Sequence, residues 1–118
     1  MKYSLLSTLF FLSVLSAKAQ NVSDLPAGKY EAKIKSAQNK WEKGDIIIID
    51  DTHYKLSSGG DIGEYKFSVA AQRIFFTSGP LKSAFTKMTL ANGKPVIILP
   101  IEQNGSLGLT AEIWASKQ

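Results

Sequence analysis

The chain has 118 residues, with 14 Lys and Arg against 10 Asp and Glu, one His and no Cys. A chain of this length holds one domain, because a second independent core would not fit. The absence of Cys excludes a disulfide framework, a thiolate metal site, a Cys nucleophile and a lipid anchor on an N-terminal Cys.

The N-terminus has the three-part pattern of a secretory signal peptide. Met1-Lys2 is basic, residues 5–15 are largely apolar, and Ala17 and Ala19 supply small residues before a cleavage point. This apolar stretch is too short to span a bilayer, and no later apolar run is long enough either. We therefore divide the chain into a signal peptide, residues 1–19, and a single all-β domain, residues 20–118.

Removal of the signal peptide changes the charge of the working protein. Lys2 and Lys18 leave with it, so the basic residues fall from 14 to 12 against 10 acidic ones, and the net charge falls from +4 to +2. A small exported domain without disulfides fits a bacterial periplasm or outer surface. We expect an exported protein, periplasmic or extracellular, that does not span the membrane.

Period-two alternation of apolar and polar residues dominates the mature chain and predicts half-buried antiparallel strands. Tyr30, Ala32 and Ile34 alternate with charged residues, and residues 63–69 and 107–113 repeat the pattern. The expected strands span residues 29–35, 45–50, 52–57, 63–69, 72–77, 85–91, 95–101 and 107–115. Residues 36–43 are the best helical candidate, but the segment is short and we expect a connection there.

The segments between these strands contain strong turn signals. Asn92-Gly93 and Asn104-Gly105 favour two-residue type I′ hairpins, since both central positions need a positive φ. Residues 58–61, Ser-Gly-Gly-Asp, favour another tight turn. Successive hairpins give an antiparallel meander of about eight short strands, which closes as a small barrel or folds over as a sandwich.

The middle of the chain has a more particular pattern, Tyr54-x-Leu56-x-x-x-Gly60-x-x-Gly63-x-Tyr65-x-Phe67, followed by Ile74-Phe75-Phe76-Thr77. Over roughly residues 50–78 it resembles the middle hairpins of small exported bacterial lipocalin-like β domains. The resemblance implies a signal peptide before an antiparallel meander. The Gly-x-Trp that opens true lipocalins is replaced here by Gly28-Lys29-Tyr30, which speaks against a lipocalin ligand cup.

Asp51 and His53 are the candidate metal ligands. On a strand, residues two apart share a face, so the carboxylate and the imidazole could bind one ion. Two ligands are too few for a tight site, and no other His or Cys completes it. The alternative is a solvated strand start, and we expect no cofactor.

Catalytic patterns are missing from the sequence. Asp50 and Asp51 would point to opposite faces of a regular strand, so they cannot form a paired-carboxylate site. The serines at 57–58 lack a nucleophile elbow, and no phosphate-binding loop is present. The lysine stripe near residue 33 is interrupted by Glu31, which argues against nucleic acid. We expect no enzyme activity.

Trp114 and Phe75 are the candidate binding surface, because alternation sends both aromatic side chains outward. We expect an exported, non-catalytic β domain that binds a partner protein or a glycan at the cell envelope. One alternative is a lipocalin-like carrier of a small apolar ligand, and a second is an envelope hydrolase or metal-dependent enzyme. A hollow interior would favour the carrier, and a packed one the binder.

Overall fold

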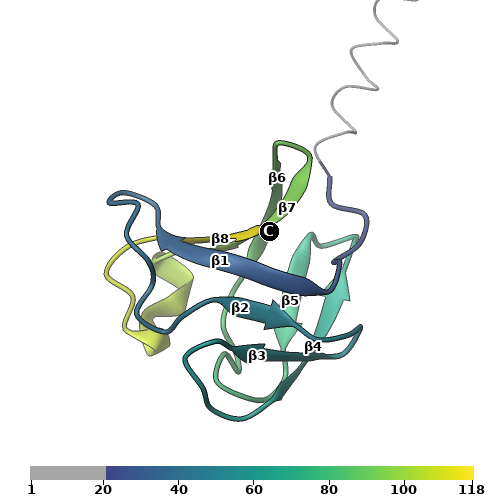
Figure 1. Ribbon diagram of the computed structural model, residues 1–118, viewed down its shortest axis with the longest axis horizontal. Coiled ribbons are helices and arrows are strands. Elements are labelled where there is room, and N and C mark those ends of the chain that lie inside the picture. The colour runs from purple at the N-terminus through teal and green to yellow at the C-terminus, as the bar shows by residue number, and fades with distance from the viewer. Residues whose placement is uncertain (1–20) are drawn as a thin grey trace, which may run out of the picture.

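The computed structural model describes residues 21–118, so the expected signal peptide lies outside the described residues (Figure 1). The alternation of apolar and polar residues produces eight strands. They are β1 (Gly28–Ile34), β2 (Ile46–Ile48), β3 (His53–Leu56), β4 (Gly63–Ser68), β5 (Arg73–Phe76), β6 (Lys87–Ala91), β7 (Lys94–Leu99) and β8 (Ile113–Lys117). In the described part of the chain the single helical element is η1 (Glu102–Leu107), a 3₁₀ helix.

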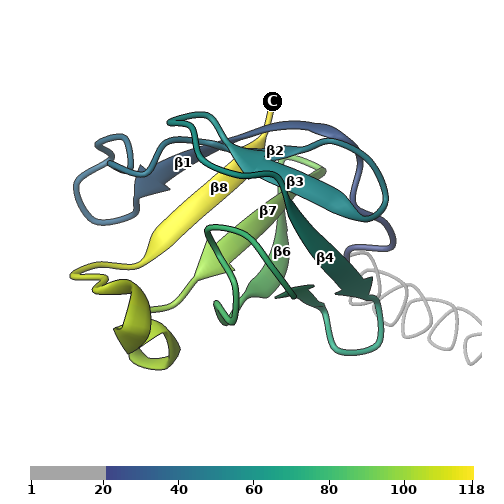
Figure 2. The ribbon, with the colours of Figure 1, turned by 90° about the horizontal axis from the view of Figure 1, so that it is seen from below.

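The strands form one sheet in the order β5-β4-β3-β2-β1-β8-β7-β6, and every neighbouring pair is antiparallel. The last strand pairs with the first, which brings the two halves of the meander together. Figure 2 shows β1, β8 and β7 side by side, and we call this part of the sheet one wall of the barrel. The sheet curls into a nearly closed barrel, so the predicted all-β meander is confirmed.

A seam between β5 and β6 completes the barrel without regular strand pairing. The backbone N–H of Ile74 donates to the Thr86 hydroxyl at 2.8 Å, and this hydroxyl donates to the Ile74 carbonyl at 2.8 Å. Met88 N–H donates to the Gln72 carbonyl one step further along. Thr86 is fully buried, so one side chain takes the place of a pairing strand at this point.

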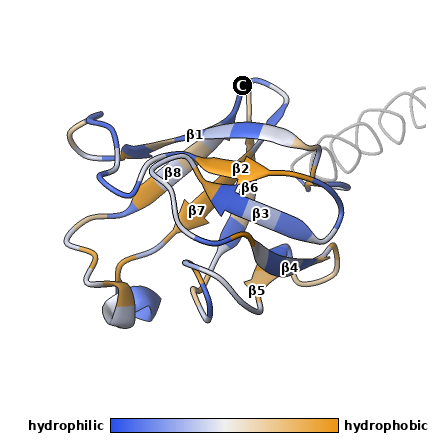
Figure 3. Cartoon of the chain, turned by 60° about the horizontal axis from the view of Figure 1, so that its bottom comes forward, coloured by the Kyte–Doolittle hydropathy of each residue, from blue (hydrophilic) through white to orange (hydrophobic). Residues whose placement is uncertain are grey.

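The interior of the barrel is packed with the chain's own side chains. Figure 3 shows β2 and β7 as strongly hydrophobic strands. Two tyrosines reach a partner from inside the core: Tyr30 donates to the Pro26 carbonyl, and Tyr54 donates to the Ser78 carbonyl. Burial raises the pKa of both phenols above the ordinary value. The largest fully buried apolar and aromatic side chains are Tyr30, Tyr54, Ile46, Ile48, Ile74, Leu81, Ile97, Leu99 and Ile113.

The hairpin predictions have different outcomes. Asn92 and Gly93 have φ of 53° and 76° and connect β6 to β7, as expected. Asn104-Gly105 is not a hairpin, because both residues lie in η1. The Asn104 side chain is buried, and it pairs with the N–H and the carbonyl of Phe85 and with the Pro100 carbonyl.

The predicted strand over residues 107–115 is wrong in its first half, because β8 begins at Ile113. Leu107 ends η1, and Leu109 lies in the following loop. Both side chains pack against the core from a segment that has no strand partner. Their alternation with polar residues therefore reflects burial against the end of the barrel and not strand pairing.

Candidate functional site

Trp114 lies on the outer face of β8. Its neighbours Ile113 and Ala115 are buried in the core, and the indole, which points the other way, is half-buried. Across the sheet Trp114 is opposite Lys33 of β1 and Ile98 of β7. The outward placement follows from strand geometry, because successive side chains point to opposite faces.

Trp114 lines a groove of about 320 Å³ on this wall. The register of β1 against β8 places Glu31 opposite Ser116 and Lys33 opposite Trp114, so these side chains share one face. The connection after β1 completes the groove. We call this site the Trp114 groove; its lining residues are Glu31, Lys33, Lys35, Gln38, Trp114 and Ser116.

Two polar contacts hold the indole in the groove. The Trp114 ring N–H donates to a carboxylate oxygen of Glu112. The Lys35 ammonium lies 4.7 Å from the centroid of the ring, a cation–π contact. Lys35 forms no ion pair with any carboxylate of residues 21–118. Its ammonium group contacts the Trp114 ring instead.

The remaining charges of the groove partly cancel. The Glu31 carboxylate lies 3.5 Å from the Lys33 ammonium and 3.8 Å from that of Lys40. Exposed pairs of this kind contribute little to stability. The groove thus offers cationic donors, carboxylate acceptors and neutral polar groups around a single aromatic ring.

A second hollow of about 420 Å³ adjoins the Trp114 groove through Lys35, which lines both. It lies over Ser36, Ile101 and the segment Thr110–Glu112. Ile101 is 43% exposed there. This extension is more apolar than the groove itself.

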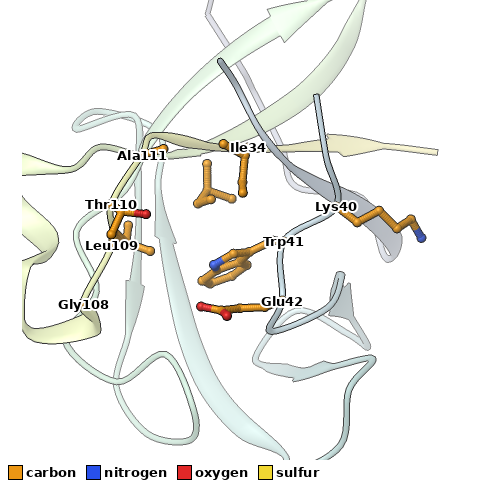
Figure 4. Close-up of a pocket in the computed structure, with 9 residues that line it drawn as sticks. Ile34, Lys40, Trp41, Glu42, Gly108, Leu109, Thr110 and Ala111 are labelled. Carbon is orange, nitrogen blue, oxygen red and sulfur yellow. The ribbon is translucent and has the colours of Figure 1, made fainter. Parts of the chain in front are cut away.

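A third pocket, of about 200 Å³, lies at one end of the barrel, where Trp41 points toward Leu109 and Thr110 (Figure 4). Lys40 lines this pocket with its backbone side, and its ammonium points away from it. Trp41 is itself part of the buried core. The pocket is smaller than the roughly 300–1,000 Å³ usual for small-molecule sites.

Phe75 is also on the outer surface, but on a different wall. It is 38% exposed on β5, between the buried Ile74 and Phe76, and lies opposite Lys66 of β4. Two strands, β7 and β6, and the seam lie between β8 and β5. The structure therefore places both predicted aromatics outside but does not bring them into one site.

Asp51 and His53 do not form the pair expected of a strand. The chain bends at residues 50–52 before β3 begins at His53, and it is the Asp50 carboxylate that lies 2.9 Å from the His53 Nδ1. Asp50 also accepts the backbone N–H groups of Thr52 and His53.

These contacts explain the ionisation of Asp50. The hydrogen bonds from the Thr52 backbone and the His53 side chain lower the pKa of the Asp50 carboxyl to about 2. The cluster caps a turn on the surface. Residues 21–118 contain no group of three or more His, Asp or Glu side chains placed to hold a metal.

Comparisons with known proteins give no relative: no family model matches the chain, and no curated protein or solved structure is significantly similar to it. Within residues 21–118, no helix has the length and hydrophobicity needed to cross a membrane.

Proposed function

We propose that the protein is an exported, non-catalytic binding domain that holds a glycan of the cell envelope in the Trp114 groove. The observation that carries this proposal is the composition of the groove: one half-buried indole, with every other lining side chain polar. Export is supported by the signal pattern of residues 1–19. The packed interior supports a ligand site on the outside of the barrel.

The chemistry of a sugar ring matches this lining. A pyranose has an apolar C–H face and a rim of hydroxyl groups that both donate and accept. The indole supplies a large flat apolar surface. Glu31 accepts hydrogen bonds, Lys33 donates them, and Gln38 does both. The groove of about 320 Å³ lies within the usual size range of ligand sites.

Lys35 covers the indole and must move before a sugar can stack on it. An exposed cation–π contact contributes about 0.5–1 kcal/mol, so its displacement costs little. The long side chain can swing aside and donate its N–H groups to the ligand's hydroxyls. Lys35 therefore acts as a movable cover of the ring.

A partner protein is the second candidate, favoured by the exposed Ile101 beside the groove. The centre of a protein interface is, however, depleted of Lys and Glu, and these residue types supply half of the lining of the Trp114 groove. The lipocalin-like carrier has less support, because the core is filled and the pocket at Trp41 is small. The lipocalin-like relationship itself stays a proposal, based on residues 50–78 and the meander.

A glycan array followed by fluorescence titration tests the proposal. The exported chain carrying Trp41→Phe keeps Trp114 as its only indole in the mature protein. We expect at least one envelope glycan to bind and to change the Trp114 emission, and Trp114→Ala to abolish binding. Phe75→Ala is the matched control, since it removes an outer aromatic from another wall and should leave binding unchanged. No binding across the array, or equal binding by Trp114→Ala, would contradict the proposal.

A further inference from the structure

The only arginine of the chain, Arg73, lies against two aromatic rings beside the barrel seam. Its guanidinium carbon is 4.5 Å from the ring centroid of Phe75 and 3.9 Å from that of Phe85. Phe75 belongs to β5, and Phe85 precedes β6 on the other side of the seam. We call these three residues the Arg73 cluster.

Hydrogen bonds fix the two sides of this cluster. Asn104 accepts from the N–H of Phe85 at 2.7 Å and donates to its carbonyl at 2.9 Å. Thr86 bonds both backbone groups of Ile74, the residue between Arg73 and Phe75. The guanidinium is thus positioned by parts of the chain that are themselves anchored, which lowers the entropy lost when a ligand binds.

The guanidinium of Arg73 has no hydrogen-bond acceptor in the described part of the chain. Its Nε is buried without an acceptor, and the guanidinium forms no ion pair with a carboxylate of residues 21–118. The two terminal nitrogens are not among the buried unpaired atoms of residues 21–118, so an anion can reach them from outside.

The surroundings define what kind of anion fits. Lys66 lies opposite Phe75 in the sheet, so a second positive charge adjoins the cluster. Phe75 is 38% exposed, and Val69, in the turn that joins β4 to β5, is 51% exposed. An occupant would therefore meet both positive charge and exposed apolar side chains.

We propose that the Arg73 cluster binds a carboxylate attached to an apolar group. The two terminal nitrogens of a guanidinium form parallel hydrogen bonds to the two oxygens of a carboxylate. The exposed ring of Phe75 then covers the apolar part of the ligand. This site is separate in position and ligand class from the Trp114 groove, and it does not depend on the glycan proposal.

Nuclear magnetic resonance tests this proposal, because a single arginine gives a single Nε–H resonance. Hexanoate is the probe, and acetate and sulfate are the controls. Acetate has the carboxylate without the longer alkyl chain, and sulfate is a tetrahedral anion. We expect hexanoate to shift the Arg73 Nε–H signal and the backbone signals of Phe75 and Phe85. Acetate and sulfate should bind at least about tenfold more weakly, a difference of 1.4 kcal/mol.

Two variants separate the proposed fork from simple charge. Arg73→Lys keeps the charge but loses the planar fork, and Phe75→Leu keeps an apolar side chain without the ring; each should weaken hexanoate binding about tenfold. Trp114→Ala should bind hexanoate like the wild type. Undisturbed Arg73 signals, equal binding of sulfate, or wild-type affinity in Arg73→Lys would overturn the proposal. N-Acetyl-leucine, compared with its amide and with hexanoate, tells a peptide carboxyl terminus from a fatty acid as the source.

Discussion

Replacement of Thr86 by valine tests how the barrel closes at the seam. Valine has the shape of threonine, so the change removes the hydroxyl and little else. The Ile74 N–H loses its acceptor and the Ile74 carbonyl loses its donor, both at 2.8 Å. Thr86 and Ile74 are fully buried, so water cannot replace these bonds.

The expected cost follows from these two unpaired groups. A buried polar group without its partner costs about 1–3 kcal/mol, and removing the buried hydroxyl recovers part of this. We expect Thr86→Val to lower the free energy of unfolding by about 2–4 kcal/mol, a large share of the roughly 5–15 kcal/mol of a typical domain. Urea denaturation followed by intrinsic fluorescence measures it.

Thr77→Val is the matched control, because Thr77 is exposed and its hydroxyl makes only a 3.3 Å contact with the Glu64 carbonyl. This change should stay within about 0.5 kcal/mol. Hydrogen exchange at the Ile74 amide should accelerate in Thr86→Val alone. Equal stability of the two variants would show that the seam does not depend on the Thr86 hydroxyl.

Three further predictions concern the turn, the loop and the tight packing around the barrel. The pKa of Asp50 is lowered from 3.8 to about 2, so its carboxylate stabilises the fold above about pH 4 and loses this effect as the pH falls through 2. Asp50→Asn should therefore lower the melting temperature at pH 6 and progressively less toward pH 2. An equal drop in melting temperature at both pH values would contradict this prediction. Asn104→Ala removes three hydrogen bonds. At about 1 kcal/mol for each bond, it should lower the free energy of unfolding in urea by about 3 kcal/mol. A loss below about 1 kcal/mol would be inconsistent with these bonds. A Cβ at Gly63 would overlap the Ser78 carbonyl oxygen, so Gly63→Ala should cost at least about 2 kcal/mol. Gly105→Ala, with nothing within 4 Å of its Cβ, should be close to neutral in the same assay.

The meander could be predicted because each hairpin is a local feature of the sequence. Alternation identified the inward face of β1 and β4, and the same rule placed Trp114 and Phe75 outside. Alternation failed after residue 106, because it reports burial on one side of the chain and not the presence of a partner strand. The buried amide of Asn104, which bonds Phe85 nineteen residues away, has no local signature beyond a common turn dipeptide.

The Trp114 groove and the Arg73 cluster could not be predicted from spacing, because each joins distant segments. Lys33 and Trp114 become neighbours only through the closing pair of β1 and β8. Sequence reasoning used the lysine stripe near Lys33 only to argue against nucleic acid, and it gave Arg73 no role. The contact of Arg73 with Phe85 depends on the seam, which is formed by one side chain and by isolated backbone bonds. A bend breaks the period of two, so the bend at residues 50–52 makes Asp50, and not Asp51, the neighbour of His53.

The most direct measurement of where this protein binds its ligand is a chemical-shift map of the two indole N–H signals during titration with the best-binding glycan from the array. Trp114 reports the outer groove, and Trp41 reports the pocket at the end of the barrel. We predict that the Trp114 indole signal moves, because its bond to Glu112 lies at the groove, together with the backbone signals of Lys33 and Ser116. A shift of the Trp41 signal with Trp114 unchanged would place the ligand at the end of the barrel and contradict a binding site on its outer wall.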